Sequence, residues 1–162
     1  MTSNTKNILS FHRANLIIWS AILSGIVILV IVISVLDSLE FILATETAAY
    51  VEKILFLIAI ALALMVIIFK RSIFLPANLV NSVRSAVEPD KEKALFDKIR
   101  RNYIIIWVLA ESICIIGIID YLLFVQLNSF LIYSVVSIYS LLINIPRQSK
   151  VEKCFELLDT TQ

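Results

Sequence analysis

Four long stretches of hydrophobic residues, separated by shorter polar segments, dominate the pattern of this chain. They cover residues 14–36, 51–69, 102–125 and 128–145. A helix that crosses a membrane needs about 20 predominantly apolar residues, because the hydrocarbon layer is about 30 Å thick. The pattern therefore predicts an all-α, polytopic membrane protein with four transmembrane helices packed as two hairpins.

Two polar segments complete this single predicted membrane domain. Residues 70–101 form a charged loop, in which Pro76 can begin a short helix because proline is tolerated in a first turn. Residues 146–162 form a tail, in which apolar residues recur at helical spacing between Val151 and Leu158. We expect short amphipathic helices in the loop and an interfacial helix in the tail.

The overall composition agrees with a membrane protein. Hydrophobic residues make up 60% of the chain and charged residues 17%, against about 45–50% and about 25% in soluble domains. The net charge of +1 indicates no nucleic-acid partner, so the lipid bilayer is the expected environment. With one histidine, two glycines and no Gly-Lys-Ser/Thr loop, the sequence offers no catalytic triad, zinc motif or phosphate cradle. We predict that it is not an enzyme and needs no cofactor or metal.

Basic residues are distributed unevenly among the polar segments. Thirteen of the 14 Lys and Arg residues lie in the N-terminal segment, the 70–101 loop and the tail, and Lys53 alone lies between the first two spans. Basic residues favour the cytoplasmic side of a membrane. We therefore expect both termini and the long loop to be cytoplasmic.

The third hydrophobic stretch carries a carboxylate near its middle. Glu111 lies roughly 13 Å along the helix from Asn102, close to the membrane midplane. An acidic residue there costs about 2.5–3.5 kcal/mol on insertion scales and normally faces other helices, water or a partner. Antiparallel pairing across a turn at 126–129 predicts Ser140 and Asn144 as its hydrogen-bond partners on the fourth span.

Three interpretations of Glu111 remain open: a structural hydrogen bond between helices, a reversible proton site, and a contact with another subunit. Asp120, nine residues further on, falls on the opposite helix face near the outer interface, where we expect a solvated anchor. The two carboxylates cannot then act as one acid/base pair. Cys114, one turn beyond Glu111, is the candidate nucleophile for an intramembrane enzyme, but packing explains it more simply.

Small residues mark possible sites of close helix contact. Ala21 and Gly25 lie four residues apart in the first span, and Ala59 and Ala63 repeat the spacing in the second. Such small-xxx-small faces let the backbones of membrane helices approach closely. Gly117 offers a similar position on the third span.

The sequence Trp107-Val-Leu-Ala-Glu111-Ser-Ile-Cys-Ile-Ile-Gly117-Ile-Ile resembles the carboxylate-bearing helix of F- and V-type ATPase c subunits. In those helices Ala-Glu is followed at this spacing by Gly and an aliphatic stretch. This resemblance implies a proton-carrying role for Glu111. A rotor ring, however, needs a Gly-rich inner helix, whereas the first span here contains only Gly25 and the second span contains none.

Residues 98–158 resemble more closely a group of uncharacterised bacterial four-helix membrane proteins. Those proteins have a Trp about four residues before the Glu, a Gly or Ala after it, and a short final span. Their basic tail opens like Pro146-Arg-Gln-Ser-Lys150. The resemblance implies a helical hairpin module of the bacterial inner membrane and no established activity.

Together these observations predict a non-enzymatic integral membrane protein, an accessory or scaffolding subunit of a membrane complex. Its partners would be other membrane subunits or copies of itself. The alternative is a c-subunit-like protein that translocates protons or other ions through Glu111.

Overall fold

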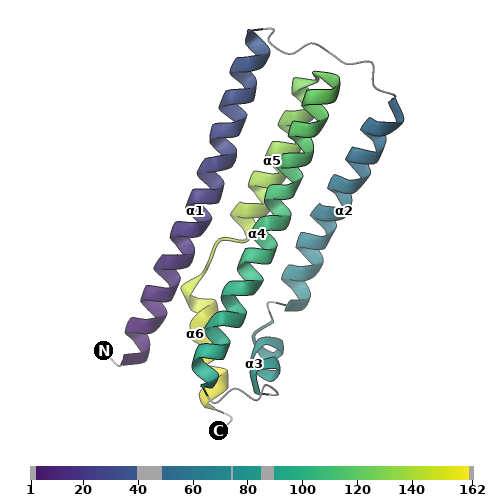
Figure 1. Ribbon diagram of the computed structural model, residues 1–162. Coiled ribbons are helices and arrows are strands. Elements are labelled where there is room, and N and C mark those ends of the chain that lie inside the picture. Colours follow the sequence, from purple (N-terminus) through teal and green to yellow (C-terminus); the bar gives the residue numbers. More distant parts are fainter. Residues whose placement is uncertain (1–2, 40–48, 74, 85–89, 161–162) are drawn as a thin grey trace.

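The computed structural model shows a bundle of helices (Figure 1). It describes residues 3–39, 49–73, 75–84 and 90–160, and within these ranges it contains six α-helices and no strand. The helices are α1 (Ser3–Ser38), α2 (Ala49–Ile73), α3 (Pro76–Arg84), α4 (Lys91–Phe124), α5 (Leu127–Ile143) and α6 (Gln148–Asp159). The all-α prediction is confirmed for these residues, and residues 74 and 85–89 of the predicted loop lie outside them.

Three helices are long and apolar enough to cross a membrane by themselves, namely α1, α2 and α4. Helix α5 has 17 residues, about 25 Å of helix, and continues into α6 after a bend of 44°. Pro146 lies in this break, as expected for a residue that cannot continue a helix. The described residues thus contain three helices that could span a membrane, or four candidate spans if α5 and α6 form one bent span, and the prediction of exactly four is not confirmed.

Helices α4 and α5 form a tight antiparallel hairpin. Val125 ends α4 with a φ of 54° in the left-handed region, and its N–H donates to the Tyr121 carbonyl at 2.8 Å. Gln126 then caps the start of α5. The chain therefore reverses within two residues, earlier than the predicted 126–129 turn, and holds a β-branched residue in a conformation that such residues rarely adopt.

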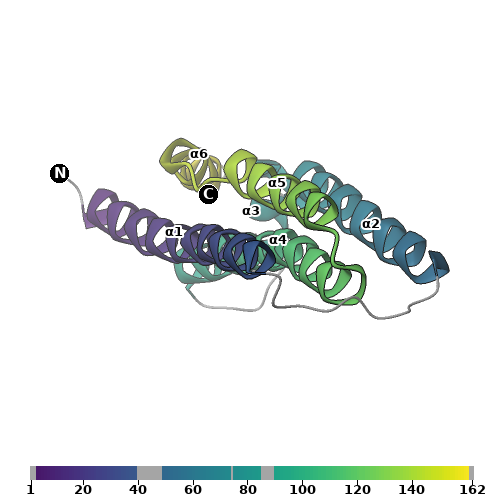
Figure 2. The ribbon, with the colours of Figure 1, turned by 90° about the horizontal axis from the view of Figure 1, so that it is seen from above.

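Helices α1 and α2 lie on either side of this hairpin (Figures 1 and 2). Each of them packs against α4 and α5. The arrangement is a central hairpin with two flanking helices, so the predicted pairing of the first two spans as a second hairpin is not confirmed. Within the apolar windows, 44% of the residues of α4 are buried but only 11% of those of α1 and of α2.

A second packed region lies at the end of the bundle that holds both chain ends (Figure 1). There α6 packs against α3 and the start of α1. The Phe96 ring of α4 lies 4.7 Å from Phe11 of α1 and 4.6 Å from Phe155 of α6, measured between centroids. The apolar face of the tail helix thus contacts protein, whereas we expected it to lie on the membrane surface.

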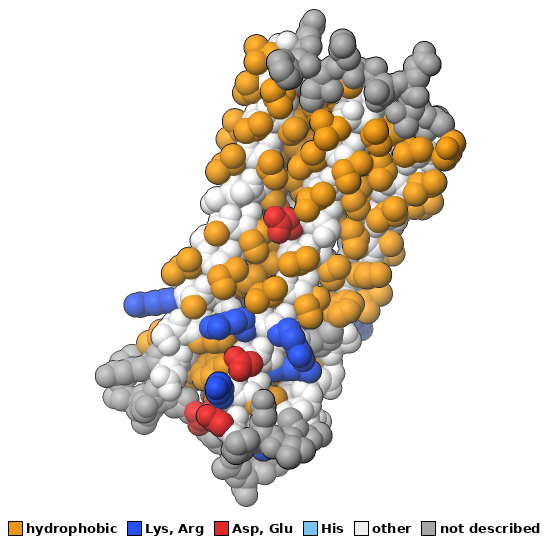
Figure 3. Space-filling view, in the orientation of Figure 1, with side chains coloured by type: hydrophobic (Ala, Val, Ile, Leu, Met, Phe, Trp, Pro, Cys, Tyr) orange, Lys and Arg blue, Asp and Glu red, His pale blue; other side chains and the backbone are white. Residues whose placement is uncertain are grey.

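The surface is divided along the length of the bundle. Figure 3 shows hydrophobic side chains covering most of one face, with a single group of acidic atoms near the middle of this band. Basic side chains gather along the lower edge of the band, on the same end as α3 and α6. This division fits a protein whose basic end emerges from one side of a membrane.

Candidate functional site

Glu111 lies at the edge of the α4 face that packs inside the bundle. Its neighbour Ala110 is fully buried, whereas Val108 and Ile115, about one turn to either side, are 51% and 47% exposed. The Glu111 side chain is half-buried, and no hydrogen bond or ion pair joins its carboxylate to another described residue. Glu111 therefore occupies an open edge of the bundle at mid-span.

The predicted partners of Glu111 on α5, Ser140 and Asn144, make no hydrogen bond to its carboxylate. The Asn144 side chain donates from Nδ2 to the Ser140 carbonyl at 2.7 Å, so this bond stays within the C-terminal end of α5. The hydroxyl that crosses to α4 at this level belongs to Ser137, which donates to the Ala110 carbonyl at 2.7 Å. A hydrogen bond between the two helices therefore exists one residue before Glu111, but it uses the backbone and leaves the carboxylate out.

The small residues fall into two groups. Ala59 is buried and Ala63 half-buried in a cluster of α2, α4 and α5 that includes Ile113 and Tyr133. On α1, by contrast, Ala21 is exposed, and a Cβ atom added at Gly25 would meet nothing within 4 Å. The α2 face is used for packing within the chain, and the α1 face is open.

Gly117 lies where helices α4 and α5 approach each other closely. A Cβ atom added there would lie 2.7 Å from the Tyr133 Cβ, closer than side chains tolerate. The absence of a side chain at Gly117 thus allows Tyr133 to pack directly on the α4 backbone.

Asp120 lies one turn beyond this contact and is the most buried carboxylate on α4. It is 0% exposed, and neither carboxylate oxygen has a hydrogen-bond partner among the described residues. Asp120 interacts electrostatically with Glu52 of α2 and with Tyr133 of α5. The predicted solvated anchor is therefore wrong, because α2 and α5 cover the α4 face on which Asp120 lies.

A polar contact at the same level connects α4 to α1. The Tyr121 hydroxyl donates to Asp37 Oδ1 at 2.9 Å. Acidic residues of three helices, Asp37, Glu52 and Asp120, thus lie near the end of the bundle that is opposite α3 and α6. This acidic level was not predicted from the sequence, although three acids at the same end of three predicted spans could have indicated it.

Three side chains from other helices donate hydrogen bonds to backbone carbonyls at the end of α5. Trp19 of α1 donates to the Leu141 carbonyl at 3.0 Å, Trp107 of α4 to the Asn144 carbonyl at 3.3 Å, and Lys70 of α2 to the Ile143 carbonyl at 2.9 Å. The last carbonyls of a helix lack partners within the helix, and water cannot reach them in hydrocarbon. The other three long helices therefore each satisfy one carbonyl where α5 ends.

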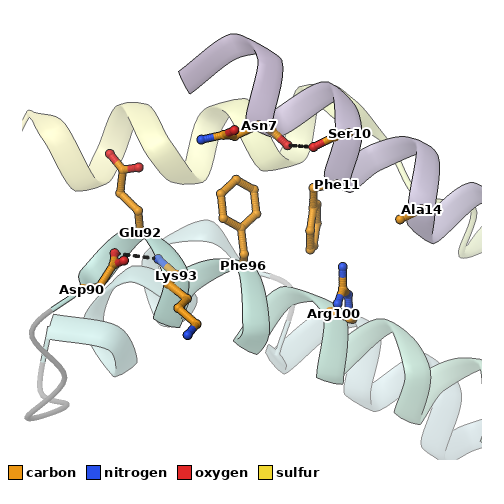
Figure 4. A pocket seen from close by; sticks show the side chains of 9 residues that line it. All are labelled: Asn7, Ser10, Phe11, Ala14, Asp90, Glu92, Lys93, Phe96 and Arg100. Carbon is orange, nitrogen blue, oxygen red and sulfur yellow. Dashed lines mark hydrogen bonds between the residues drawn. The ribbon is translucent and has the colours of Figure 1, made fainter. Parts of the chain in front are cut away.

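Grooves open on the surface that the described residues form, and two of them are more than 500 Å³ in volume. The groove in Figure 4, about 530 Å³ in volume, lies between the start of α1 and the start of α4. Arg100 lies 5.4 Å from the centroid of the Phe11 ring, and Asp90 accepts a hydrogen bond from the Lys93 backbone N–H, so these groups stabilise the helices themselves. The second groove, about 560 Å³, lies between α2 and α5 and is mainly apolar.

The next question is whether the described residues include a reactive nucleophile or a metal-binding cluster. Cys114 is fully buried, with its Sγ 3.8 Å from Ser134 Oγ, and the Ser134 hydroxyl donates to the Phe130 carbonyl. Within the described ranges, no three His, Cys, Asp or Glu side chains come together in a way that could hold a metal ion. The arrangement around Glu111 and Asp120 is suited to contacts between helices.

Comparisons with known protein families, with proteins of curated function and with solved structures gave no match for this chain.

Proposed function

We propose that this chain is a non-enzymatic accessory or scaffolding subunit of a membrane complex. It crosses a bacterial inner membrane four times, with α5 as the short fourth crossing, and keeps both termini in the cytoplasm. The gathering of basic side chains at the end of α3 and α6 supports this orientation, because the cytoplasmic side of a membrane protein is enriched in Lys and Arg.

The observation that carries this proposal is the half-exposed position of Glu111 at mid-span. A carboxylate in the hydrocarbon layer normally faces a helix, water or a partner. The described part of this chain supplies no hydrogen bond to it, and exposed Val108 and Ile115 flank it. A helix of another subunit that covers this edge would remove the carboxyl from lipid and supply its hydrogen-bond partner.

The open face of α1 supports the same proposal. Ala21 and Gly25 have small side chains or none, so this face does not project far from the α1 backbone. Ile17 and Ile28 beside them are 67% and 59% exposed. Helix packing in membranes depends on close van der Waals contact at small residues. A partner helix can therefore approach the α1 backbone on the side that faces away from the bundle.

Native mass spectrometry of the chain, extracted gently from its own membranes, tests the accessory role. We expect unlike subunits at a fixed stoichiometry. The substitution Val108→Trp should reduce their recovery at least tenfold, because a bulky ring beside Glu111 blocks close packing. Leu64→Trp, at a 54% exposed position of α2, is the matched control and should leave recovery unchanged. A closed ring of identical copies would contradict the proposal.

The second candidate function is c-subunit-like translocation of protons or other ions by Glu111. It is favoured by the same half-exposure, because a carrier carboxyl at mid-span must exchange its proton with a neighbouring subunit. Glu111→Gln keeps most hydrogen bonding and abolishes proton exchange. In vesicles that contain the complex, the accessory role predicts unchanged proton flux for this variant, and a fall to background would establish translocation instead.

A further inference from the structure

The packing of α2 against α4 brings two carboxylates, Glu52 and Asp120, to the same level of the bundle. Ala59 of α2 and Ile113 of α4 belong to one packed cluster. Glu52 precedes Ala59 by seven residues, and Asp120 follows Ile113 by seven. Seven residues are two helical turns, which return to the same helix face roughly 10 Å further on. Because α2 and α4 run in opposite directions (Figure 1), both steps lead toward the end opposite α3 and α6.

Neither carboxylate is paired with a described residue. Asp120 is 0% exposed, and its two oxygens have no hydrogen-bond partner there. The half-buried Glu52 makes no hydrogen bond or ion pair within the described part of the chain. Like charges that lie close together with little water around them repel each other, and a cation beside them favours the ionised form of both. The pair therefore attracts a positively charged ligand.

The mainly apolar groove of about 560 Å³ between α2 and α5 opens beside this pair. Glu52 and Tyr133 both line it. The same Tyr133 packs on Gly117, which lies about one turn before Asp120 on α4. Tyr133 also interacts electrostatically with both carboxylates. The groove and the buried carboxylate of Asp120 thus adjoin the same tyrosine.

The other walls of the groove indicate the class of ligand. Phe56, Leu57 and Ile132 line it with exposed apolar side chains. Cavities of about 300–1,000 Å³ suit small organic molecules, and an aromatic ring attracts a cation to its face. A metal ion takes several oxygen ligands, whereas this groove joins apolar walls to one acidic end. Its shape and charge therefore favour an organic cation with an apolar body.

We propose that the groove between α2 and α5 binds a lipophilic organic cation. The charged group of this ligand contacts Glu52, and its apolar part lies along Phe56, Leu57 and Ile132. Asp120 does not line the groove and acts through the field of its buried charge. This site depends on neither Glu111 nor a partner subunit, so it can be tested on the isolated chain whether or not the accessory role holds.

The test is equilibrium dialysis of tetraphenylphosphonium against the purified full-length chain in micelles of a neutral detergent. The wild type should bind this cation saturably and should not bind tetraphenylborate, which has the same shape and the opposite charge. Glu52→Gln should weaken binding roughly tenfold or more, and Asp120→Asn roughly threefold, because the first charge contacts the ligand and the second acts from a distance.

Two further variants distinguish the site from general attraction to the acidic end. Lys53 lines the groove and is exposed, so it competes with the ligand for Glu52. Lys53→Gln should therefore strengthen binding roughly twofold to threefold. The matched control is Asp37→Asn, which removes an equal charge from α1 at the same end and keeps an oxygen for the Tyr121 hydroxyl. It should leave binding unchanged.

Several results would overturn the proposal. Saturable binding of tetraphenylborate would show partition into an apolar groove without recognition of charge. A loss in Asp37→Asn equal to that in Glu52→Gln would show unspecific attraction to acidic residues. Unchanged binding in Glu52→Gln, or no saturable binding by the wild type, would exclude the site. Since Glu52 and Lys53 are not fully buried, their variants decide the question even if Asp120→Asn fails to fold.

Discussion

Glu111 and Asp120 are two carboxylates on one helix, and they differ in how far the neighbouring helices bury them. Glu111 lies at mid-span, where an acid is most costly, yet it is half-exposed at an open edge. Asp120 lies near the acidic end of the bundle, where exposure would be cheaper, yet it is 0% exposed with both oxygens unpartnered by described residues. Position along α4 therefore does not decide which of the two carboxylates is buried.

The difference follows from which helices cover which face of α4. Helices α2 and α5 close over the face that carries Gly117 and Asp120, with Tyr133 packed on the glycine. At the level of Glu111, the hydrogen bond from Ser137 to Ala110 connects the neighbouring face to α5, and the edge beyond it stays open. Asp120 is thus a feature of the interior, and Glu111 is a feature of the surface that another subunit would cover.

The largest effect that separates these two regions is expected at the glycines. Gly117→Leu should destabilise the protein by about 3 kcal/mol or more, because its first added atom already collides with Tyr133. Gly25→Leu meets open space and should be neutral or should stabilise α1 by up to about 1 kcal/mol. Denaturant unfolding in detergent micelles measures both variants, and equal losses would contradict the distinction between a packed and an open face.

A buried group at the other end of the molecule should give the next largest effect. Burial raises the pKa of the Cys154 thiol to about 11 from 9.0. The folded state therefore holds its proton in a range where the unfolded state loses it, so stability should fall as pH rises from 9 to 11. The expected loss is about 2–3 kcal/mol near pH 11.

The control for this pH dependence is Cys154→Ser, because a hydroxyl does not titrate in the same range. The difference between the unfolding free energies of wild type and variant should therefore change between pH 9 and 11. This difference isolates the thiol from Lys150, whose lowered pKa acts in the opposite direction. A constant difference would show that α6 does not keep the Cys154 thiol buried.

A substitution of Asp120 should change the free energy of unfolding by less than these changes, and in the stabilising direction. Asp120→Val removes two buried oxygens that lack partners and should stabilise the protein by about 1–2 kcal/mol, since an unsatisfied buried polar group costs about 1–3 kcal/mol. Thermal and denaturant unfolding of the purified protein measure the change. A loss of stability would mean that the carboxyl makes a favourable interaction, and the contrast with Glu111 would need another cause.

Glu111→Gln should give the smallest effect on the stability of the isolated chain, within about 0.5 kcal/mol. The side chain is half-exposed, and no described residue binds it, so surface-type substitution values apply. The same unfolding measurement compares it directly with Asp120→Val. A loss above 2 kcal/mol would show that the Glu111 carboxyl is held within the chain.

The hydrophobic pattern predicted much of the fold. It identified the helical class, the start of α3 at Pro76, and the end of α4 near Val125. Helical spacing also correctly placed Glu111 and Asp120 on different faces. It could not say which face the neighbours cover, because that depends on α1 and α2 flanking a central hairpin, which no local pattern reveals.

Other parts of the structure depend on contacts between residues far apart in the chain. The pattern of the tail predicts an amphipathic helix, but lipid and protein are equally apolar partners for its face. The bonds from Trp19, Trp107 and Lys70 to the end of α5 depend on where a short helix stops beside three longer ones. Asn15 and Asn102 are likewise buried, which no local pattern in the sequence indicates.

The central claim is that the edge of α4 around Glu111 meets a helix of another subunit. Photo-crosslinking in native membranes, with benzoylphenylalanine in place of Ile115, tests this most directly, and Met65 of α2 provides a control position with nearly equal exposure. We expect a discrete crosslinked polypeptide of fixed mass from position 115 and a much weaker product from position 65. Crosslinks to lipid alone at position 115 would contradict the claim.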